Sequence, residues 1–250
     1  MTHLELTRDR GISILAMRRG KVNALNVEMV SELHAGLSEI EADESIRALI
    51  LTGHGRFFSF GLDVPELYPL PPEAFARFLG DFTRLYTRIY GFPKPVLAAV
   101  NGHAIAGGGM LALACDRRLM VSEGARIGLN EITFGSSVFA GSVEMLRALV
   151  GQARAEQVLF SGGMYPAEEA RDLGLVDRIV PVADLLPATF EEARALAERS
   201  STAYGHLKRM LRGPALEAMR RREADSILEF VAIWYSDATR EQLRRIQIRS

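Results

Sequence analysis

The chain has 250 residues, of which 48% are hydrophobic and 24% charged, and its formal net charge at pH 7 is -1. This length suits one domain with a large core, or one domain plus an appendage, and the near-zero charge makes general affinity for nucleic acid or an anionic membrane unexpected. Cys115 is the only cysteine, which excludes an intrachain disulfide and fits a reducing compartment such as the cytoplasm.

The first third of the chain alternates strand and helix patterns. Residues 4–8 and 11–17 are predicted to pair as a hairpin around Asp9-Arg10-Gly11. A helix is predicted over 27–42, with Asn26 as its N-cap. A buried strand over 47–52, a loop over 55–63 and a helix over 73–90 follow.

The middle of the chain repeats this order. A buried strand is predicted over 96–100, then a turn at Asn101-Gly102, the triplet Gly107–Gly109 and an apolar helix over 110–115. Strands are predicted over 118–122 and 125–128. From residue 140 the chain is mainly helical, apart from an edge strand over 175–180, and the basic tail 206–249 is helical. Strands that alternate with helical crossovers predict a parallel sheet with right-handed connections.

One segment has the length and apolarity of a membrane span. Residues 96–115 are twenty positions without Asp, Glu, Lys or Arg. They contain several glycines, Asn101 and His103, and they divide into a strand, a turn and a helix. This segment is therefore predicted to be buried core, and the N-terminus has no apolar stretch of the kind that a secretory signal needs.

The glycine triplet is the first candidate site. Glycine lets a ligand approach the backbone, and the first amides of a helix have no intrahelical acceptor, so the triplet suits an anion or a developing oxyanion. The loop Phe58–Asp63 leaves its strand at the same edge of the predicted sheet, so the amides of Leu62 and Gly108 are predicted to point into one cleft. Tight helix packing and a simple turn are the alternative interpretations of these two stretches.

Glu131 is the second candidate. Its sequence neighbours include Ile127, Leu129, Ile132 and Phe134. An apolar setting raises the pKa of a carboxyl group, which suits a general acid or base near neutral pH. A surface glutamate at a strand edge is the alternative.

Four motifs occur in order along the chain. They are Phe58-Ser-Phe-Gly-Leu-Asp63, the stretch from Lys94 to Gly109, Gly128-Leu-Asn-Glu131 and the stretch from Ala167 to Asp177. Together they resemble the enoyl-CoA hydratase/isomerase (crotonase) family over residues 1 to about 210. The resemblance implies an α/β fold, with a crotonase-like spiral of β-β-α turns over 1–200 and a helical C-terminal extension over 201–250 that builds a homotrimer or hexamer.

The resemblance also implies a substrate and a set of site residues. The substrate is an acyl-CoA thioester, with no separate cofactor and no metal, in fatty acid metabolism by β-oxidation. Leu62 and Gly108 would donate their amides to the thioester carbonyl, and Glu131 would transfer protons. The residues expected to line the substrate and CoA path are Lys21, Asn23, Ala24, Leu25, Ser59, Phe60, Gly61, Asp63, Gly107 and Asn130, of which Asp63 is expected to fix its loop by accepting amide hydrogen bonds.

Two departures from the family pattern bear on the reaction. Family hydratases carry two glutamates, and the position of the first is Leu111 here. Hydration draws on both carboxylates, whereas moving a double bond from C3 to C2 needs one group that removes a proton at C2 and returns it at C4. The sequence therefore favours a Δ3,Δ2-enoyl-CoA isomerase. Phe60 stands where the family has a small residue, so a narrower acyl or pantetheine channel is expected.

Other functions remain open at this point. The same scaffold is compatible with hydration, thioester hydrolysis or decarboxylation. A non-catalytic relative that binds RNA or a protein through its basic tail, with Arg220–Arg222, is a further alternative, although charge runs are usually solvated. His34 and His54 have no metal-ligand spacing, and His103 is expected to be packed or solvated.

Overall fold

Two sheets form the centre of the molecule. The computed structural model describes residues 2–246 and 248. One sheet has the strand order β1-β2-β3-β5-β7-β10 and the other the order β4-β6-β8-β9. The strands are β1 (Leu4–Asp9), β2 (Ile12–Met17), β3 (Ala48–Gly53), β4 (Phe57–Ser59), β5 (Val96–Val100), β6 (His103–Ile105), β7 (Arg117–Val121), β8 (Arg126–Gly128), β9 (Tyr165–Pro166) and β10 (Arg178–Val180).

The chain alternates between the two sheets and then enters a helix. It passes from β3 to β4, from β5 to β6 and from β7 to β8, and helical segments follow each pair. The pairs β3/β5, β5/β7, β4/β6 and β6/β8 are all parallel. This repetition is a spiral of β-β-α turns, which confirms the predicted α/β fold. Parallel strands bring their carboxyl ends to one edge, so the loops after β4 and β6 meet.

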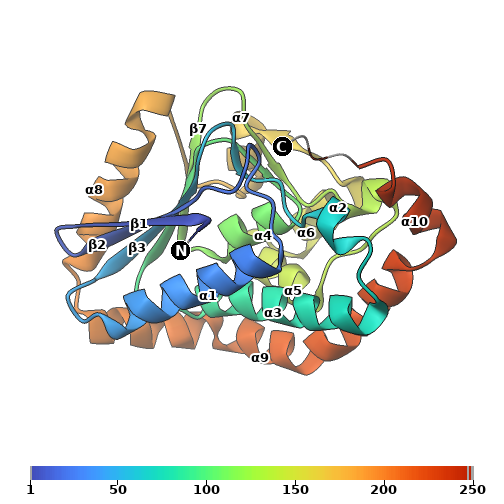
Figure 1. Ribbon diagram of the computed structural model, residues 1–250. Helices are drawn as coiled ribbons and strands as arrows, with labels where there is room; N and C mark the ends of the chain where they lie inside the picture. The colour runs from blue at the N-terminus through green and yellow to red at the C-terminus, as the bar shows by residue number, and fades with distance from the viewer. Residues whose placement is uncertain (1, 247, 249–250) are drawn as a thin grey trace.

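Helices enclose the sheets on both sides. In Figure 1, α8 lies across the six-stranded sheet from α1, while α3 and α9 run along the lower side. Helix α8 contacts β2, β3, β5 and β7. The helices are α1 (Val27–Ala42), α2 (Val64–Leu67), α3 (Pro72–Tyr90), α4 (Gly107–Ala114), α5 (Ala140–Val150), α6 (Gln152–Ser161), α7 (Ala167–Leu173), α8 (Leu185–Ala197), α9 (Ser201–Trp234) and α10 (Asp237–Leu243), with 3-10 turns η1 (Glu131–Phe134) and η2 (Val182–Asp184).

Several local predictions are confirmed. The hairpin closes between Asp9 and Ile12, and Arg10 and Gly11 take φ values of 45° and 78°, as a tight two-residue turn requires. The Asn26 side chain accepts a hydrogen bond from the Met29 amide at 2.9 Å, so it caps α1. No helix in the described part of the chain is both long and apolar enough to cross a membrane.

Several elements differ from the predictions. Helix α4 begins at Gly107 and not at residue 110, because the Met110 amide donates to the Ala106 carbonyl at 2.9 Å and the glycines form the first turn. Strands β4, within the predicted loop 55–63, and β6 were not predicted, since three residues carry too little periodicity to be recognised. Strand β10 starts at Arg178, because the amides of Leu175 and Val176 close the end of α7 by donating to Ala170.

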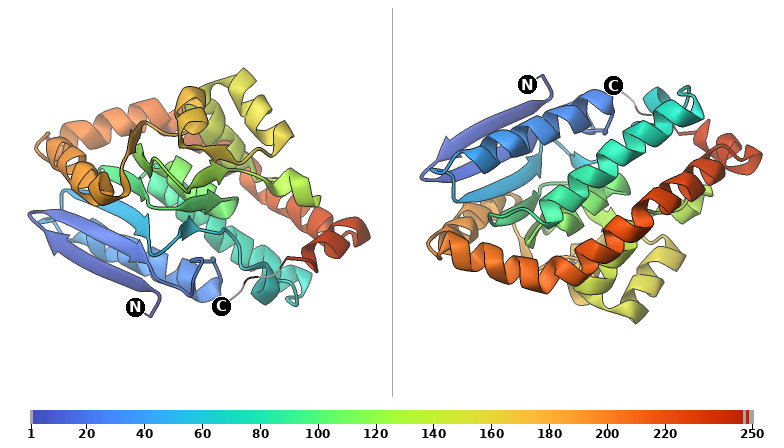
Figure 2. Two further views of the ribbon diagram at one scale, coloured as in Figure 1. Left: turned by 90° about the horizontal axis from the view of Figure 1, so that it is seen from above. Right: turned by 90° about the horizontal axis from the view of Figure 1, so that it is seen from below.

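The C-terminal tail folds against its own core. Helix α9 contacts α3 and α5, and the right-hand view in Figure 2, seen from below, shows it running beside α3 along the molecule. The tail is helical from residue 201 to 234 and again over α10, while its predicted end at residues 247 and 249 lies outside the described residues. A boundary between residues 200 and 201, and assembly through the tail, stay predictions.

Asp116 joins α9 to the sheet. It accepts a hydrogen bond from the Val96 amide and from Lys208 Nζ, both at 2.7 Å, and Arg212 lies 3.1 Å away. Replacing Asp116 with Ala leaves two cations without their anion in the interior, so we expect a loss of about 3–5 kcal/mol in the free energy of unfolding. Urea unfolding measures this loss. Glu191→Ala, which removes an exposed ion pair with Arg194, serves as the control and is expected to change stability little. An equal effect of both variants would contradict the prediction.

Candidate active site

Two loops meet at the edge where β4 and β6 end. Gly61 has a φ of 94°, and a Cβ on it would lie 2.7 Å from the Ile105 carbonyl oxygen and 3.0 Å from the Gly107 nitrogen. Only glycine combines this backbone conformation with so close an approach. The Gly61 carbonyl accepts the Leu25 amide at 2.8 Å, and the Asp63 amide donates to the Leu25 carbonyl at 3.0 Å, so the loop is held on both sides of Leu62.

The amides of Leu62 and Gly108 remain available as donors. Within the described residues, neither amide has a hydrogen-bond acceptor. Gly108 belongs to the first turn of α4, where the helix dipole adds to the donor strength of the free amide. Leu62 and Gly107 line the same cavity. The geometry thus suits stabilisation of an oxygen that gains negative charge.

Ala106 sets the direction of this helix start. Its φ of 50° and ψ of -119° lie outside the regions that L-residues favour, and its amide donates to the Gly128 carbonyl at 2.9 Å. A conformation of this kind persists only where surrounding contacts hold it, and it is typical of functional sites.

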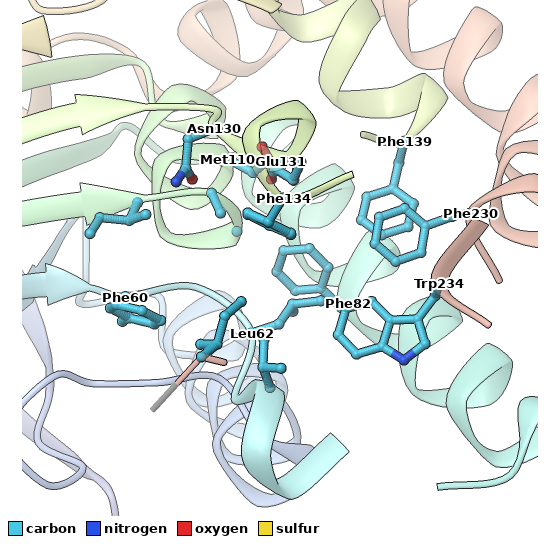
Figure 3. A pocket seen from close by; sticks show the side chains of 15 residues that line it. Phe60, Leu62, Phe82, Met110, Asn130, Glu131, Phe134, Phe139, Phe230 and Trp234 are labelled. Atoms are coloured by element: carbon cyan, nitrogen blue, oxygen red, sulfur yellow. The ribbon is translucent and has the colours of Figure 1, made fainter. Parts of the chain in front are cut away.

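A cavity of about 200 Å³ extends from the two loops into the protein. Figure 3 shows Phe60 and Asn130 on one side of it, Phe139, Phe230 and Trp234 on the other, and Glu131 between them. Its described lining is apolar except for Asn130, Glu131 and the indole nitrogen of Trp234. The lining residues are Phe60, Leu62, Val64, Phe82, Ile105, Ala106, Gly107, Met110, Asn130, Glu131, Phe134, Phe139, Phe230, Trp234 and Ile246.

Glu131 is the only carboxylate among the described residues that line this cavity. It opens the turn η1, its side chain is 5% exposed, and its Oε2 has no hydrogen-bond partner within the described part of the chain. Burial raises the pKa of Glu131 to about 8, and a hydrogen bond from its own backbone opposes this rise. Of its predicted apolar neighbours, Phe134 lines the cavity with it, whereas Ile132 is 49% exposed. Met110 and Phe139, from other parts of the chain, complete the apolar surroundings.

This raised pKa predicts a pH profile. A base must be deprotonated to accept a proton, so the kcat/KM for a reaction that begins with proton abstraction should rise about tenfold per pH unit below pH 8 and level off above it. Initial rates between about pH 5.5 and 9.5 measure this profile. A kcat/KM that stays flat from pH 6 to 9 would contradict the prediction.

Asn130 lies beside Glu131 at the cavity. Its Oδ1 is buried and has no hydrogen-bond partner within the described residues, and the same holds for Oε2 of Glu131. A buried acceptor without a partner suits a donor supplied by a ligand or water.

An ion-pair cluster holds the loop that carries Leu62. Asp63 accepts the Glu66 amide at 3.2 Å, which caps α2, and it pairs with Arg19 Nη1 at 2.6 Å. Arg19 also donates to the Ala24 carbonyl at 3.1 Å and pairs with Glu66 at 2.6 Å. Asp63 thus acts within the protein as a support of the loop, and sequence reasoning did not identify Arg19.

The other predicted path residues divide into two groups. Asn23, Leu25 and Ser59 are fully buried. Asn23 donates to the carbonyls of His54 and Phe57, and Ser59 Oγ donates to the Asn23 carbonyl, so these side chains hold the loops together.

Lys21, Ala24 and Phe60 line surface grooves outside the cavity. Phe60 lines both the cavity and the neighbouring groove that contains Lys21 and Arg56, so it stands at their junction. The narrower channel predicted from Phe60 stays a prediction.

The aromatic wall of the cavity was not predicted. Phe82 comes from α3, Phe139 precedes α5, and Phe230 and Trp234 come from α9. No local signal joins residues so far apart in the chain. Met110, assigned to the core from the sequence, also faces the cavity.

Leu111 is fully buried and is not part of the described lining, so the cavity-facing side chain of α4 is that of Met110. The described residues contain no group of three or more His, Cys, Asp or Glu side chains placed to hold a metal ion. His103 is half-buried and packs on Phe57 with a ring-centroid distance of 5.1 Å.

Known proteins share this fold and much of this sequence. A family model described as enoyl-CoA hydratase/isomerase matches residues 7–239. A Thermus thermophilus protein named as a candidate enoyl-CoA hydratase is 44% identical over 179 residues, covering 70% of this chain and 68% of that protein. Enoyl-CoA delta isomerase 1 of Rattus norvegicus mitochondria is 30% identical over 228 residues, or 90% of this chain and 76% of the relative.

Solved structures agree with these sequence matches. The crystal structure of human mitochondrial Δ3-Δ2-enoyl-CoA isomerase matches with a TM-score of 0.93 at 27% identity, covering 97% of this chain and 95% of that one.

Proposed function

The chain belongs to the enoyl-CoA hydratase/isomerase family, and on that basis we propose that it converts 3-enoyl-CoA to 2-trans-enoyl-CoA. Glu131 is the single acid and base of this proposal, and the amides of Leu62 and Gly108 form the oxyanion hole. The observation that most directly supports this proposal is that Glu131 is the one carboxylate among the described residues that line the cavity.

The reaction is a 1,3-proton shift. Glu131 removes a proton from C2, and the electron pair of the C–H bond forms a C1–C2 double bond while the thioester oxygen becomes negative. Conjugation with the C3–C4 double bond spreads this charge into a dienolate, and the two amides stabilise the oxygen. The proton on Glu131 then passes to C4, which leaves the double bond between C2 and C3 and restores the carboxylate.

The apolar cavity supports this assignment of roles. A dienolate that forms away from water is protonated only by the group placed above it, so a dry cavity keeps the proton between C2 and C4. The raised pKa of Glu131 brings the acidity of the carboxyl closer to that of the substrate carbon, which favours transfer in both directions.

The groove beyond Phe60 suits the remainder of the substrate. CoA carries phosphate groups, and the groove presents the cationic side chains of Lys21 and Arg56. The substrate is the acyl-CoA itself, and the proposal includes no further cofactor. We also propose that the chain forms a homotrimer or hexamer, that it is located in the cytoplasm and that it serves β-oxidation.

Hydration of 2-enoyl-CoA is the second candidate. The Thermus thermophilus relative, at 44% identity, carries a hydratase name. A single carboxylate must then both orient water and protonate C2, which makes hydration the weaker candidate for this cavity.

Turnover of the two substrate classes tests the proposal. Purified protein is given 3-enoyl-CoA, and formation of the conjugated 2-enoyl thioester is followed by ultraviolet absorbance. A parallel reaction with 2-enoyl-CoA is assayed for 3-hydroxyacyl-CoA. We expect isomerisation to exceed hydration by at least about 10²-fold in kcat/KM, the lower range for one general acid-base group. Robust hydration without isomerisation would overturn the assignment.

A further inference from the structure

The inner end of the cavity is closed by stacked aromatic rings. Phe139 and Phe230 stack with a centroid distance of 4.5 Å, and Trp234 lies 6.0 Å from Phe230. All three side chains are at most 3% exposed. In Figure 3 they stand on the side of the cavity away from Phe60, so a chain entering past Phe60 runs toward them.

A second layer supports this wall. Phe75 of α3 packs on Trp234 with a centroid distance of 4.5 Å and on Phe230 at 6.3 Å, and it is fully buried. The wall cannot recede without disturbing this close-packed layer, because interiors of this density have few voids to accept a displaced ring. The cavity therefore has a fixed depth.

The volume of the cavity limits the number of carbons in the acyl chain that it can hold. A dry cavity of about 150 Å³ accepts benzene, which has six carbons, so about 200 Å³ accommodates about eight. Leu62 and Gly107 belong to the lining, so this count begins at the thioester carbon. We propose that the protein selects apolar acyl chains of up to about eight carbons, and that Phe230 and Trp234 of α9 set the limit. The inference rests on the proposed function in taking the cavity as the acyl site.

The lining also selects against a charged chain end. No Lys, Arg or His belongs to the described lining. A terminal carboxylate would lose its hydration there without gaining a partner, and its nearest ionisable neighbour would be another carboxyl group, Glu131. The substrate class is therefore an acyl thioester of up to about eight carbons without a charged chain end.

Binding of saturated acyl-CoA esters tests the limit without requiring turnover. Their dissociation constants are measured by calorimetry for chains of four, six, eight, ten and twelve carbons. Affinity should increase about fourfold per added methylene up to eight carbons, as burial of apolar surface predicts, and should then stop increasing. Affinity that keeps rising through twelve carbons would overturn the inference.

A pair of variants locates the limit. Phe230→Leu removes a ring from the wall. The break, meaning the chain length at which affinity stops increasing, should therefore move from eight carbons to ten or more. A damaged fold does not produce such a gain in affinity. Phe92→Leu removes a ring of equal size from the core outside the described lining and should leave the break at eight. A folded Phe230→Leu protein with the break still at eight would contradict the role of α9. If that variant does not fold, the wild-type series decides alone.

The two proposals fail in different ways. A protein that shows the break at eight carbons but does not isomerise 3-enoyl-CoA refutes the proposed function and leaves the chain-length limit. A protein that isomerises twelve-carbon substrates as well as eight-carbon ones refutes the limit and leaves the function.

Discussion

Glu131→Gln is expected to lower kcat for isomerisation of 3-enoyl-CoA by about 10²- to 10⁴-fold, the range that general acid-base catalysis contributes. Glutamine keeps the volume and the polarity of the side chain but cannot accept a proton from C2. Because Glu131 is the one carboxylate of the described lining, no neighbouring group takes over its role. Appearance of the conjugated product, followed by ultraviolet absorbance at saturating substrate, measures the loss.

The control for this variant is Glu123→Gln, which changes an exposed glutamate to the same amide. It should retain full activity. Binding of a saturated acyl-CoA should be almost unchanged in Glu131→Gln, since the substitution removes a proton acceptor and leaves the cavity volume. Wild-type activity in Glu131→Gln would exclude Glu131 as the acid and base, and a loss confined to KM would assign it to binding.

The same substitution has an effect on stability that depends on pH. Because its pKa is raised to about 8, Glu131 keeps its proton in the folded protein up to about pH 8, whereas the unfolded chain releases it near the ordinary carboxyl pKa of 4.5. Folding is therefore favoured by this group below pH 4.5, and the contribution is lost as the pH rises through 8. Glutamine does not titrate, so thermal unfolding of the variant should lack this decline, relative to wild type, between pH 5 and 8.

Gly108→Ala is expected to lower kcat by at least about 10²- to 10³-fold, the effect of losing one oxyanion donor. A Cβ at this position would collide with the carbonyl group and the side chain of Ser59. Ser59 is fully buried and belongs to the strand that leads to Leu62, so it cannot move without shifting the other donor. One methyl group therefore disturbs both amides.

Gly213→Ala is the matched control, because a Cβ there meets no atom within 4 Å and the residue lies inside α9. Gly213 lies outside the described lining of the cavity, so this variant should be fully active. No gain in stability is expected, because the ring of Pro214 crowds a Cβ on the residue before it. The discriminating result is the split between kcat and KM. Loss of oxyanion stabilisation lowers kcat, whereas a retained kcat in Gly108→Ala would show that the Gly108 amide does not stabilise the transition state.

Through helix α9, the C-terminal part of the chain reaches the cavity. Asp116 anchors it to the sheet through Lys208 and Arg212, and its far end delivers Phe230 and Trp234 to the cavity. Changes at the anchor are therefore expected to affect stability first, and changes at the far end to affect chain-length preference.

The sequence alone determined those features of the protein that depend on residues adjacent in the chain. The hairpin at Arg10-Gly11, the N-cap Asn26 and the limits of α1 and β5 follow from turn chemistry, capping and periodicity, which act over a few positions. The order of the motifs was enough to indicate the family. Its candidate donors and Glu131 are found at one cavity or beside it.

Only the tertiary structure decided what surrounds those residues. The apolar setting of Glu131 comes partly from its sequence neighbour Phe134 and partly from distant segments that supply Met110 and Phe139, while Ile132 faces outward. Helix α4 starts at Gly107 because Ala106 is held in its unusual conformation next to β8, a contact with no sequence pattern. The wall of Phe139, Phe230 and Trp234 exists because α9 packs against α3 and α5. Periodicity shows which face of a helix is buried but not what it is buried against, and that partner sets the volume and polarity of the site.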